Sequence, residues 1–358
     1  MKLVIYGLTV TSSWGNGHAT TFRSLLRALH MRGHHIRFIE KDVEWYRNHR
    51  DLPKPDFCSV HLYRDWELEE ESLVSEARDA DAIIIGSYFP DAIRATEALL
   101  TINAGPLMFY DIDTPVTMAA LRKHGRCDYL EARLIPHYTT YLSFTGGPTL
   151  RELEESFGSP HAVPLYCSVD SERYRPVASR SEFRCAMSYL GTHATDRQPK
   201  LMQMLNDTAR ELPEETFIVA GPMYPQDTPW AANVGRMDHV APPDHPAFYA
   251  SAHFTLNLTR RDMVEAGYSP SVRLFEASAC GAAILSDAWP GMEEFLTPGE
   301  EILLPGTMDE VVRIIRDLSD EERIRMGRRA RERILAEHTS VHRAQELEAA
   351  VASCTALR

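Results

Sequence analysis

The sequence predicts an α/β fold of two Rossmann-like, doubly wound parallel sheets that face each other across a cleft. Its 358 residues are enough for two domains of ordinary size. Short apolar runs alternate with longer amphipathic stretches along the whole chain, which indicates parallel sheets covered by helices on both faces. Between the two halves, a polar stretch at 171–182 that contains Pro176 interrupts the pattern. We therefore expect one domain at 1–170 and a second at 171–338.

The first half contains six apolar runs that predict strands. They lie at 3–6, 36–40, 82–86, 107–111, 141–145 and 162–165. Helical patterns separate most of them, at 19–32, 69–78 and 92–101. Strands of this length between helices are typical of βαβ units.

The second half repeats the scheme. Strands are predicted at 186–190, 217–220, 238–241, 254–257, 283–286 and 302–304. Helices are predicted at 197–211, 246–250, 271–280 and 308–318, followed by a long charged helical region from 320 to about 356. Ligands of such sheets bind outside the carboxyl ends of the strands, so we expect the functional residues there.

Composition excludes several functional classes. Hydrophobic residues make up 44% of the chain, charged residues 25%, and the net charge is −13. Non-specific nucleic-acid binding needs clustered Lys and Arg, which an acidic chain without a basic block lacks, so no nucleic-acid partner is expected. The six cysteines form no CxxC pair, which argues against a zinc site and indicates free thiols in a reducing compartment.

The amino-terminal segment MKLVIYGLTV is interpreted as a first strand and not as a signal peptide. No apolar run approaches the roughly 20 residues that a bilayer span requires. The sequence therefore predicts a cytoplasmic protein with no transmembrane segment.

The segment SPSVRLFEASACG at 269–281 predicts a phosphate site. Ser269 is a good helix N-cap, and Pro270 suits the first helical position. The N–H groups of Ser271 and Val272 would then point out of the helix start and, with the helix dipole, attract an anion. Glu276 would lie roughly 9 Å further along, where its carboxylate can accept hydrogen bonds from a ribose. The alternative is an ordinary capped helix with Glu276 on its solvated face.

A glycine-rich loop, GLTVTSSWGNGHATT, follows the first predicted strand. Gly15 and Gly17 let the backbone approach a phosphate or a sugar closely, and we assign them to the donor site. A dinucleotide fingerprint is a poor fit, because Thr20 stands where its third glycine is needed, and no P-loop lysine follows. His18 is a candidate general base, since its ordinary pKa lies near neutrality, or else bonds locally at the helix start.

Two further pairs of charged residues follow predicted strands. Arg197 and Lys200 in GTHATDRQPK are candidates to stabilise a departing diphosphate, although most Arg and Lys side chains are simply solvated. Asp111 and Asp113 form an Asp-x-Asp that suits a divalent metal. No further cluster of oxygen ligands accompanies them, so we favour helix capping or sugar contact by Asp113 and predict no metal.

Trp14, Asp42 and Trp45 are assigned to the acceptor side. Aromatic rings beside carboxylates suit stacking on a sugar and bonding to its hydroxyls, and the segment after the second strand carries Glu40 and Tyr46 as well. The alternative for this segment is a partly buried loop anchor.

Taken together, these motifs resemble one family over nearly the whole chain. The chain resembles the CgeB-like (spore maturation protein type) glycosyltransferases of the GT-B fold, which are related to the group-1 glycosyltransferases. The resemblance rests on SSWGNGHATT, DIDTPVT, LSFTGGPTL, LGTHATDRQP, LNLTRRDMVEAGYSPSVRLFEASACG and SDAWPGMEEFL. It implies metal-independent transfer of a sugar from a UDP- or GDP-type donor, bound mainly by the second domain. It also implies that a last helix, at about 339–358, returns to the first domain.

The resemblance extends to single residues. Glu276 would match the ribose-binding glutamate of the wider group, and Arg197 and Lys200 its diphosphate-binding cations. Tyr268 stands where the wider group has a glutamate that touches the donor sugar. We also place His239 and Val240, in a predicted strand of the second domain, on the donor side.

Two mechanisms remain open. In a retaining reaction, which the 269–281 segment favours, a donor phosphate oxygen takes the acceptor proton. In an inverting reaction, His18 is the base, oriented by Asp113, and turnover by a His18→Ala variant would separate the two. The acceptor is unknown. A sugar-nucleotide epimerase or hydrolase, or a non-catalytic nucleotide-sugar-binding or coat assembly protein, are the alternative functions.

Overall fold

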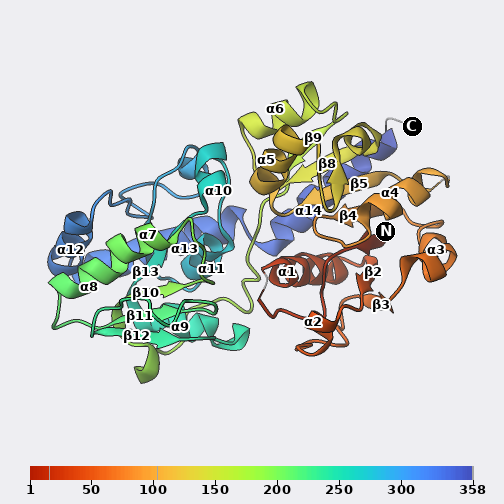
Figure 1. Ribbon diagram of the computed structural model, residues 1–358. Coiled ribbons are helices and arrows are strands. Elements are labelled where there is room, and N and C mark those ends of the chain that lie inside the picture. Colours follow the sequence, from red (N-terminus) through yellow and green to blue (C-terminus); the bar gives the residue numbers. More distant parts are fainter. Residues whose placement is uncertain (16, 103, 357–358) are drawn as a thin grey trace. The chain divides into compact units, whose positions relative to one another are not determined.

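The computed structural model describes residues 1–15, 17–102 and 104–356, and it divides the chain into two compact units. The first unit comprises Met1–Ser168 and Ser340–Arg358, and the second comprises Val169–Thr339. Each unit is built around one parallel sheet flanked by helices (Figure 1). The predicted α/β class with two parallel-sheet domains is confirmed.

The sheet of the first unit has seven parallel strands in the order β3-β2-β1-β4-β5-β8-β9. These strands are β1 Lys2–Tyr6, β2 His35–Lys41, β3 Ser59–Tyr63, β4 Ala82–Gly86, β5 Leu107–Asp111, β8 Thr140–Ser143 and β9 Ala162–Pro164. Six of them match predicted runs. The sequence does not predict β3, because this edge strand buries only its last residue and so carries no apolar run.

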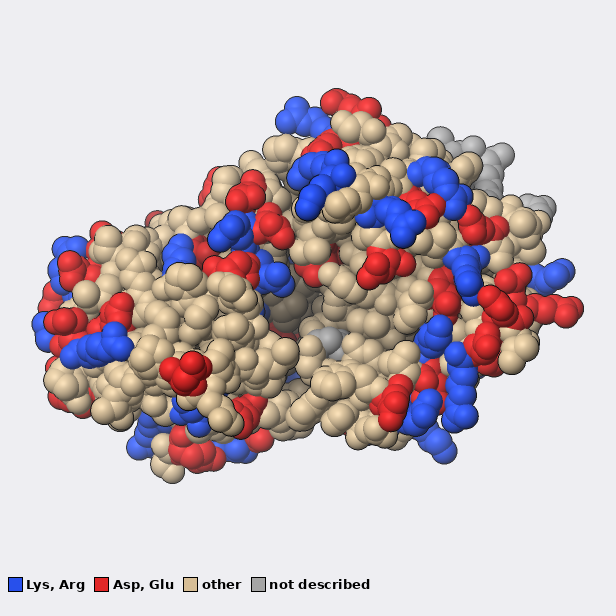
Figure 2. Space-filling model, viewed as in Figure 1, with Lys and Arg blue, Asp and Glu red and all other residues tan. Residues whose placement is uncertain are grey.

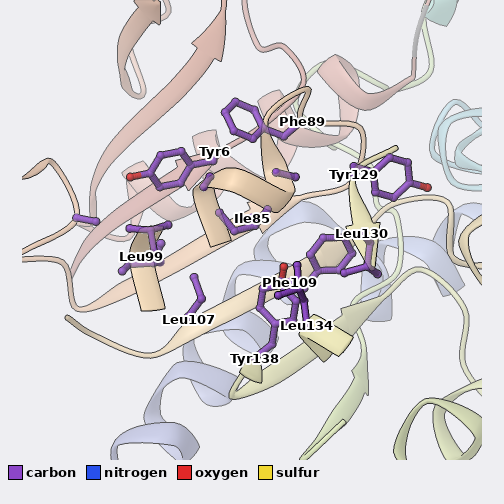
Figure 3. Close-up of a cluster of buried hydrophobic side chains, with 14 of the residues drawn as sticks. Tyr6, Ile85, Phe89, Leu99, Leu107, Phe109, Tyr129, Leu130, Leu134 and Tyr138 are labelled. Carbon is purple, nitrogen blue, oxygen red and sulfur yellow. The ribbon is translucent and has the colours of Figure 1, made fainter. Parts of the chain in front are cut away.

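Helices cover both faces of this sheet. They are α1 His18–Met31, α2 Glu44–Arg47, α3 Trp66–Ser75, α4 Ala92–Leu100, α5 Thr114–His124, α6 Pro148–Glu155 and α14 Ser340–Ala356, with a two-stranded ribbon of β6 Arg126–Cys127 and β7 Leu130–Glu131 and a 3₁₀ turn at Ala132–His137. On one face, Phe22 of α1 packs edge-on against Phe38 and Tyr110, and α14 packs on α1. Ile85 and Phe109 belong to the buried cluster of the other face (Figure 3).

The second unit has five parallel strands in the order β12-β11-β10-β13-β14. These strands are β10 Cys185–Leu190, β11 Phe217–Ala220, β12 Val234–Met237, β13 Ala252–Asn257 and β14 Ala283–Ser286. Its helices are α7 Gln198–Leu201, a π segment Met202–Asp207, α8 Thr208–Glu211, α9 His245–Ser251, α10 Arg261–Ala266, α11 Val272–Ala279, α12 Met308–Asp317 and α13 Asp320–Glu337, with 3₁₀ turns at Ser181–Phe183, Pro242–Asp244 and Met292–Glu294.

Three expected elements differ in the second unit. The strand expected at 238–241 lies at Val234–Met237, where it pairs with Phe217–Ala220, so 238–241 is the loop beyond its carboxyl end. The run at 302–304 makes only isolated bridges, such as Leu303 to Leu285. The long terminal helix is two helices, because His338 packs against Phe275 and Phe295 and interrupts it.

Charge and hydropathy add two findings. Lys and Arg side chains are interspersed with Asp and Glu over the face of the molecule in Figure 2. Within the described part of the chain, no helix combines the length and the apolar character needed to cross a membrane.

Candidate functional site

At the carboxyl edge of the second sheet, the backbones of two glycines are in close contact. Gly191 follows β10 and Gly221 follows β11. Gly221 has a φ of 138°, and a Cβ there would lie 2.1 Å from the carbonyl oxygen of Gly191. Only glycine fits this close approach. Arg197 lies in the loop after β10. The contact between the two glycines sets the position at which this loop begins.

Arg273 spans this edge from the first turn of α11. Its Nε donates to the carbonyl of Leu190 at 2.8 Å, and its Nη1 donates to Oδ1 of Asn257 at 2.8 Å. The guanidinium carbon lies 4.9 Å from the ring centre of Tyr189. A guanidinium has five N–H donors, so donors remain for a ligand. Arg273 was not predicted as a site residue from the sequence, although its place at the start of the phosphate-site helix was a usable signal.

Arg197 lies close enough to Arg273 for their charges to interact. Its Nη2 donates to the carbonyl of Thr192 at 2.9 Å, while its buried Nε has no partner among the described residues. Burial, and then the charges of Arg273 and Arg260, lowers the pKa of Arg197. Three guanidinium groups therefore lie within electrostatic range of one another at the carboxyl edge of this sheet, an arrangement that favours an anionic ligand.

Lys200 reaches the same edge and faces a buried carboxylate. Its Nζ lies 3.9 Å from Oδ2 of Asp287, the residue directly after β14. Asp287 also accepts hydrogen bonds from the backbone N–H and the hydroxyl of Thr259. Burial raises the pKa of Asp287, and Lys200 opposes that shift. Asp287 is a second residue of this edge that the sequence analysis missed.

The start of α11 differs from the prediction. Ser269 and Pro270 are buried residues ahead of the helix, Ser271 occupies the N-cap position with an extended backbone, and Val272 is the first helical residue. The expectation that Ser269 caps the helix and Pro270 begins it is therefore wrong. The N–H groups at the helix tip are those of Val272 and Arg273, which places the tip beside the guanidinium cluster.

Tyr268 explains the shifted helix start. Its backbone is left-handed, with a φ of 47°, and its N–H donates to the carbonyl of Pro290 at 2.6 Å. Further along, the hydroxyl of Ser271 donates to Oδ1 of Asn257 at 2.7 Å instead of to its own helix. These two tertiary bonds hold the segment extended until Val272, which no local propensity reveals.

Glu276 is buried, with 6% of its surface exposed, so the alternative of a solvated face is wrong. The hydroxyl of Tyr249 donates to its Oε2 at 3.3 Å. Burial raises the pKa of Glu276 to about 7, against the opposing effect of Tyr174 and Tyr249. The carboxyl therefore titrates near neutrality beside the phenol groups of Tyr174 and Tyr249.

Val240 is linked to Tyr174, and through it to Glu276, by His245. Nε2 of His245 lies 3.1 Å from the carbonyl of Val240, and Nδ1 lies 3.2 Å from the hydroxyl of Tyr174. Tyr174 in turn acts on Glu276. His239 is exposed in the same loop. Both residues thus follow β12, although the strand itself lies earlier than predicted.

An open pocket of about 530 Å³ adjoins the guanidinium cluster. The lining residues are His193, Ala194, Thr195, Asp196, Arg260, Arg261 and Asp262. Asp196 accepts hydrogen bonds from Nε of Arg260 at 3.1 Å and from the backbone N–H of Arg261 at 3.0 Å. The pocket is therefore polar and lies at the carboxyl edge of the sheet.

In the first unit, Tyr88 stands between His18 and Asp113. The rings of His18 and Tyr88 meet edge-on with their centres 5.1 Å apart, and the Tyr88 hydroxyl donates to Oδ2 of Asp113 at 3.0 Å. Burial lowers the pKa of His18 to about 4, which leaves the imidazole neutral at physiological pH. Its buried Nδ1 has no hydrogen-bond partner among the described residues.

Asp113 sits at the N-cap position of α5 without capping it through its side chain, so the capping role expected from the sequence is wrong. Its carboxylate instead binds the hydroxyl of Tyr88. Gly15 has a left-handed φ of 68°, and both Gly15 and Gly17 have open space where a side chain would be. Residue 16, between them, lies outside the described residues.

The two predicted acceptor-side tryptophans meet at a histidine. The Trp14 ring stacks on the His49 ring with their centres 4.7 Å apart, and the Trp45 ring centre lies 5.8 Å from that of His49. Trp14 and Trp45 are 38% and 61% exposed, so each ring keeps part of its surface accessible beside His49.

Asp42 is the centre of an ion-pair network and not a free carboxylate. Arg47, Arg50 and Arg64 all donate to its side chain. Burial opposes ionisation, but these three hydrogen bonds outweigh it and lower the pKa of Asp42 to about 2. Asp42 therefore anchors the loop, which is the alternative that the sequence left open for this segment.

Asp111 is occupied by protein hydrogen bonds. It accepts from the Tyr141 hydroxyl at 2.6 Å, the Thr117 hydroxyl at 3.0 Å and the Asp113 N–H at 3.1 Å. Burial raises the pKa of Asp111 to about 6. In the described ranges, no three His, Cys, Asp or Glu side chains gather in a way that could hold a metal ion.

Comparison with known proteins gives a family match for part of the chain. Residues 197–349 match the family model described as glycosyl transferase-like. The matched region begins at Arg197 and includes α11 with Arg273 and Glu276. No curated protein sequence matches the chain significantly. The predicted enzyme class, a glycosyltransferase, is confirmed by the family match.

Solved structures match the fold over its whole length. Sucrose-phosphate synthase from Thermosynechococcus elongatus has a TM-score of 0.70 at 14% identity, with 100% of both chains covered. HepE from Anabaena, in complex with UDP-glucose, has 0.70 at 13%, covering 99% of this chain and 100% of that chain. A structure described as "trehalose-6-phosphate from E. coli bound with UDP-2-fluoro glucose" has a TM-score of 0.67 at 11% identity, covering 98% of this chain and 99% of that chain. The predicted GT-B fold is thereby confirmed.

Proposed function

Given the glycosyltransferase class of its second half and its GT-B fold, we propose that the chain transfers a sugar from a UDP- or GDP-type donor to a hydroxyl acceptor. The guanidinium cluster of Arg197, Arg260 and Arg273 is the observation that carries the proposal. We further propose that the chain belongs to the CgeB-like branch, on the motifs quoted above. The UDP and UDP-glucose found in complexes of HepE support a uridine donor.

The diphosphate is held at the carboxyl edge of the second sheet. The N–H groups of Val272 and Arg273 lie at the tip of α11, and the cations of Arg273 and Arg197 lie beside them. Backbone N–H groups at a helix start and preorganised cations stabilise the negative charge that develops on a departing diphosphate. Lys200 supplies a further cation, held by Asp287.

The ribose of the donor binds Glu276. Its carboxylate already accepts the hydroxyl of Tyr249 and interacts with that of Tyr174, and a carboxylate can accept several such bonds. The backbone of Val240, whose carbonyl contacts His245, supplies polar groups for the nucleobase. Tyr268 takes the place of the glutamate that touches the donor sugar in the wider group, so the sugar meets a phenol there.

The reaction needs no metal in this proposal, because Arg197, Lys200 and Arg273 neutralise the leaving group. We favour retention, with a donor phosphate oxygen taking the acceptor proton. His18, neutral at physiological pH, remains the base of an inverting reaction. Its buried Nδ1 has no partner among the described residues, and to accept a proton at the other ring nitrogen the imidazole must carry its own proton on Nδ1, as a buried, unbonded N–H. That cost supports the retaining route.

We expect UDP to raise the melting temperature of the chain and NAD to leave it unchanged. A ligand that binds only the folded state stabilises it by about 2.7 kcal/mol at one hundred times its Kd. Thermal unfolding with UDP, GDP, UDP-glucose and NAD, each titrated to 5 mM as roughly the upper limit of specific binding, provides the measurement. A melting temperature unmoved by all the nucleotide diphosphates would refute the proposal.

A second prediction concerns pH. Below its ordinary pKa of 4.5, the carboxyl of Glu276 is protonated in both the folded and the unfolded chain; between 4.5 and about 7 only the unfolded chain loses the proton. Folding is therefore increasingly disfavoured across this window and constant above it. We expect the wild-type chain to lose on the order of 1–3 kcal/mol relative to Glu276→Gln between pH 4.5 and 7.5. Urea unfolding of both proteins measures the difference; parallel pH profiles would contradict it.

A further inference from the structure

Tyr88 has a backbone conformation that tyrosine rarely adopts. Its φ is 62°, and of the described residues other than glycine only Met223 and Tyr268 share a positive φ. Both neighbours are fixed: the Ser87 N–H donates to the Tyr110 carbonyl at 2.9 Å, and Phe89 is fully buried. Strain of this kind persists only where the surroundings impose it, and it concentrates at functional sites.

The strained backbone aims the Tyr88 side chain at the proposed acceptor groups. Its ring meets the His18 ring edge-on, and its hydroxyl binds Asp113. On a third side, the Tyr129 ring lies with its centre 4.5 Å away. Tyr88 therefore links the imidazole of His18 to the carboxylate of Asp113.

These contacts close into a ring. Asp113 donates its N–H to Asp111, Thr117 donates its hydroxyl to Asp111, and the hydroxyls of Thr117 and Tyr129 lie 2.7 Å apart. The ring of Tyr129 in turn contacts the ring of Tyr88, at a tilt of 40°. A closed network restricts each member, because moving one side chain breaks bonds on both sides of it.

The charged groups around Tyr88 favour an uncharged ligand over an anionic one. Asp113 and then Asp111 are the charged groups that act most on its hydroxyl, and both are negative. The imidazole of His18 is neutral. A phosphate or carboxylate placed here would meet like charge, whereas an uncharged hydroxyl would find a carboxylate acceptor and aromatic rings.

We propose that Tyr88 is a positioning residue that holds Asp113 and His18 as one unit for an acceptor hydroxyl, and that the acceptor is an uncharged carbohydrate. This inference rests on the proposed function for the transfer itself. It assigns to Tyr88 a role in the first unit that is independent of the cation cluster in the second.

The test uses the ring-proton NMR signals of His18, assigned by their loss in His18→Gln. Methyl α-glucopyranoside and glucose 6-phosphate are the matched neutral and anionic probes. In the full-length chain we expect saturable shifts of the His18 signals with the neutral sugar, and at least fivefold weaker binding of the phosphate. In Tyr88→Phe, which keeps the ring and loses the bond to Asp113, we expect the neutral sugar to bind at least fivefold more weakly.

Tyr138→Phe is the matched control, because its buried hydroxyl also loses one bond, to Thr96 at 2.7 Å, in the core of the same unit. It should bind the sugar within twofold of the wild-type chain. Equal affinity in wild type and Tyr88→Phe would overturn the positioning role. Equal or tighter binding of glucose 6-phosphate, or no shift with the neutral sugar, would overturn the acceptor class. UDP binding, measured on the same samples, reports separately on the proposed function.

Discussion

An Arg273→Ala variant is expected to bind UDP about 100-fold more weakly than the wild-type chain, a loss of about 2.7 kcal/mol. Arg273 is the cation at the tip of α11, and hydrogen bonds to charged groups contribute about 1.5–3 kcal/mol each. Its bonds to Leu190 and Asn257 hold the guanidinium in place before the ligand arrives. Little ordering entropy is therefore lost on binding, which makes the whole interaction available as affinity.

The measurement is a calorimetric titration of UDP into wild type, Arg273→Ala and Arg273→Lys. Lysine keeps the charge but loses the planar fork, so we expect it to recover only part of the affinity. Arg328→Ala is the control, since Arg328 is an exposed arginine of the same unit whose ion pair among the described residues is with Glu332 on its own helix. Unchanged UDP affinity in Arg273→Ala, with a normal unfolding curve, would exclude the proposed diphosphate site.

The second large effect is expected from a single methyl group. Gly221→Ala should destabilise the second unit by at least about 3 kcal/mol, because the added Cβ would lie 2.1 Å from the Gly191 carbonyl oxygen and the φ of 138° is one that alanine avoids. Backbone, unlike the end of a flexible side chain, cannot move aside cheaply. We also expect weaker UDP binding, since the loop that carries Arg197 starts at Gly191.

Gly235→Ala provides the matched control. Gly235 lies in the neighbouring strand β12, has no positive φ, and its Cβ would meet nothing closer than 3.6 Å. Thermal unfolding should show a drop of roughly 6–12 °C for Gly221→Ala, using 2–4 °C per kcal/mol for a unit of this size, and little change for Gly235→Ala. Similar melting temperatures for the two variants would contradict the prediction, because they would show that the loops at Gly191 and Gly221 move apart with little loss of stability.

Apolar periodicity was enough to predict the sheets because most strands are buried on both faces. β4, β5, β11 and β14 begin and end where the sequence predicts. β3 was missed and β12 was displaced, and both are edge strands with exposed residues. An exposed edge strand is held by backbone hydrogen bonds to one neighbouring strand, and hydropathy does not reveal backbone hydrogen bonds.

For the candidate site, strand ends and helix-start patterns directed attention to the segments at 191–200 and 269–281. They did not predict which side chains meet. Arg273 and Asp287 act through partners 83 and 28 residues away in the chain, and Tyr88 joins His18 to Asp113 from a third strand end. Such pairs depend on which strands are neighbours in the sheet.

The sequence by itself determined the class of the protein: two parallel α/β units and motifs of a glycosyltransferase, because burial on both faces and glycine turns are local properties of the chain. The tertiary structure decided where α11 begins, that Glu276 is buried and titrates near neutrality, and which cations surround the proposed diphosphate. Those features arise from the left-handed Tyr268, from desolvation and from contacts between strand ends. Each requires residues distant in sequence to be packed together before it exists.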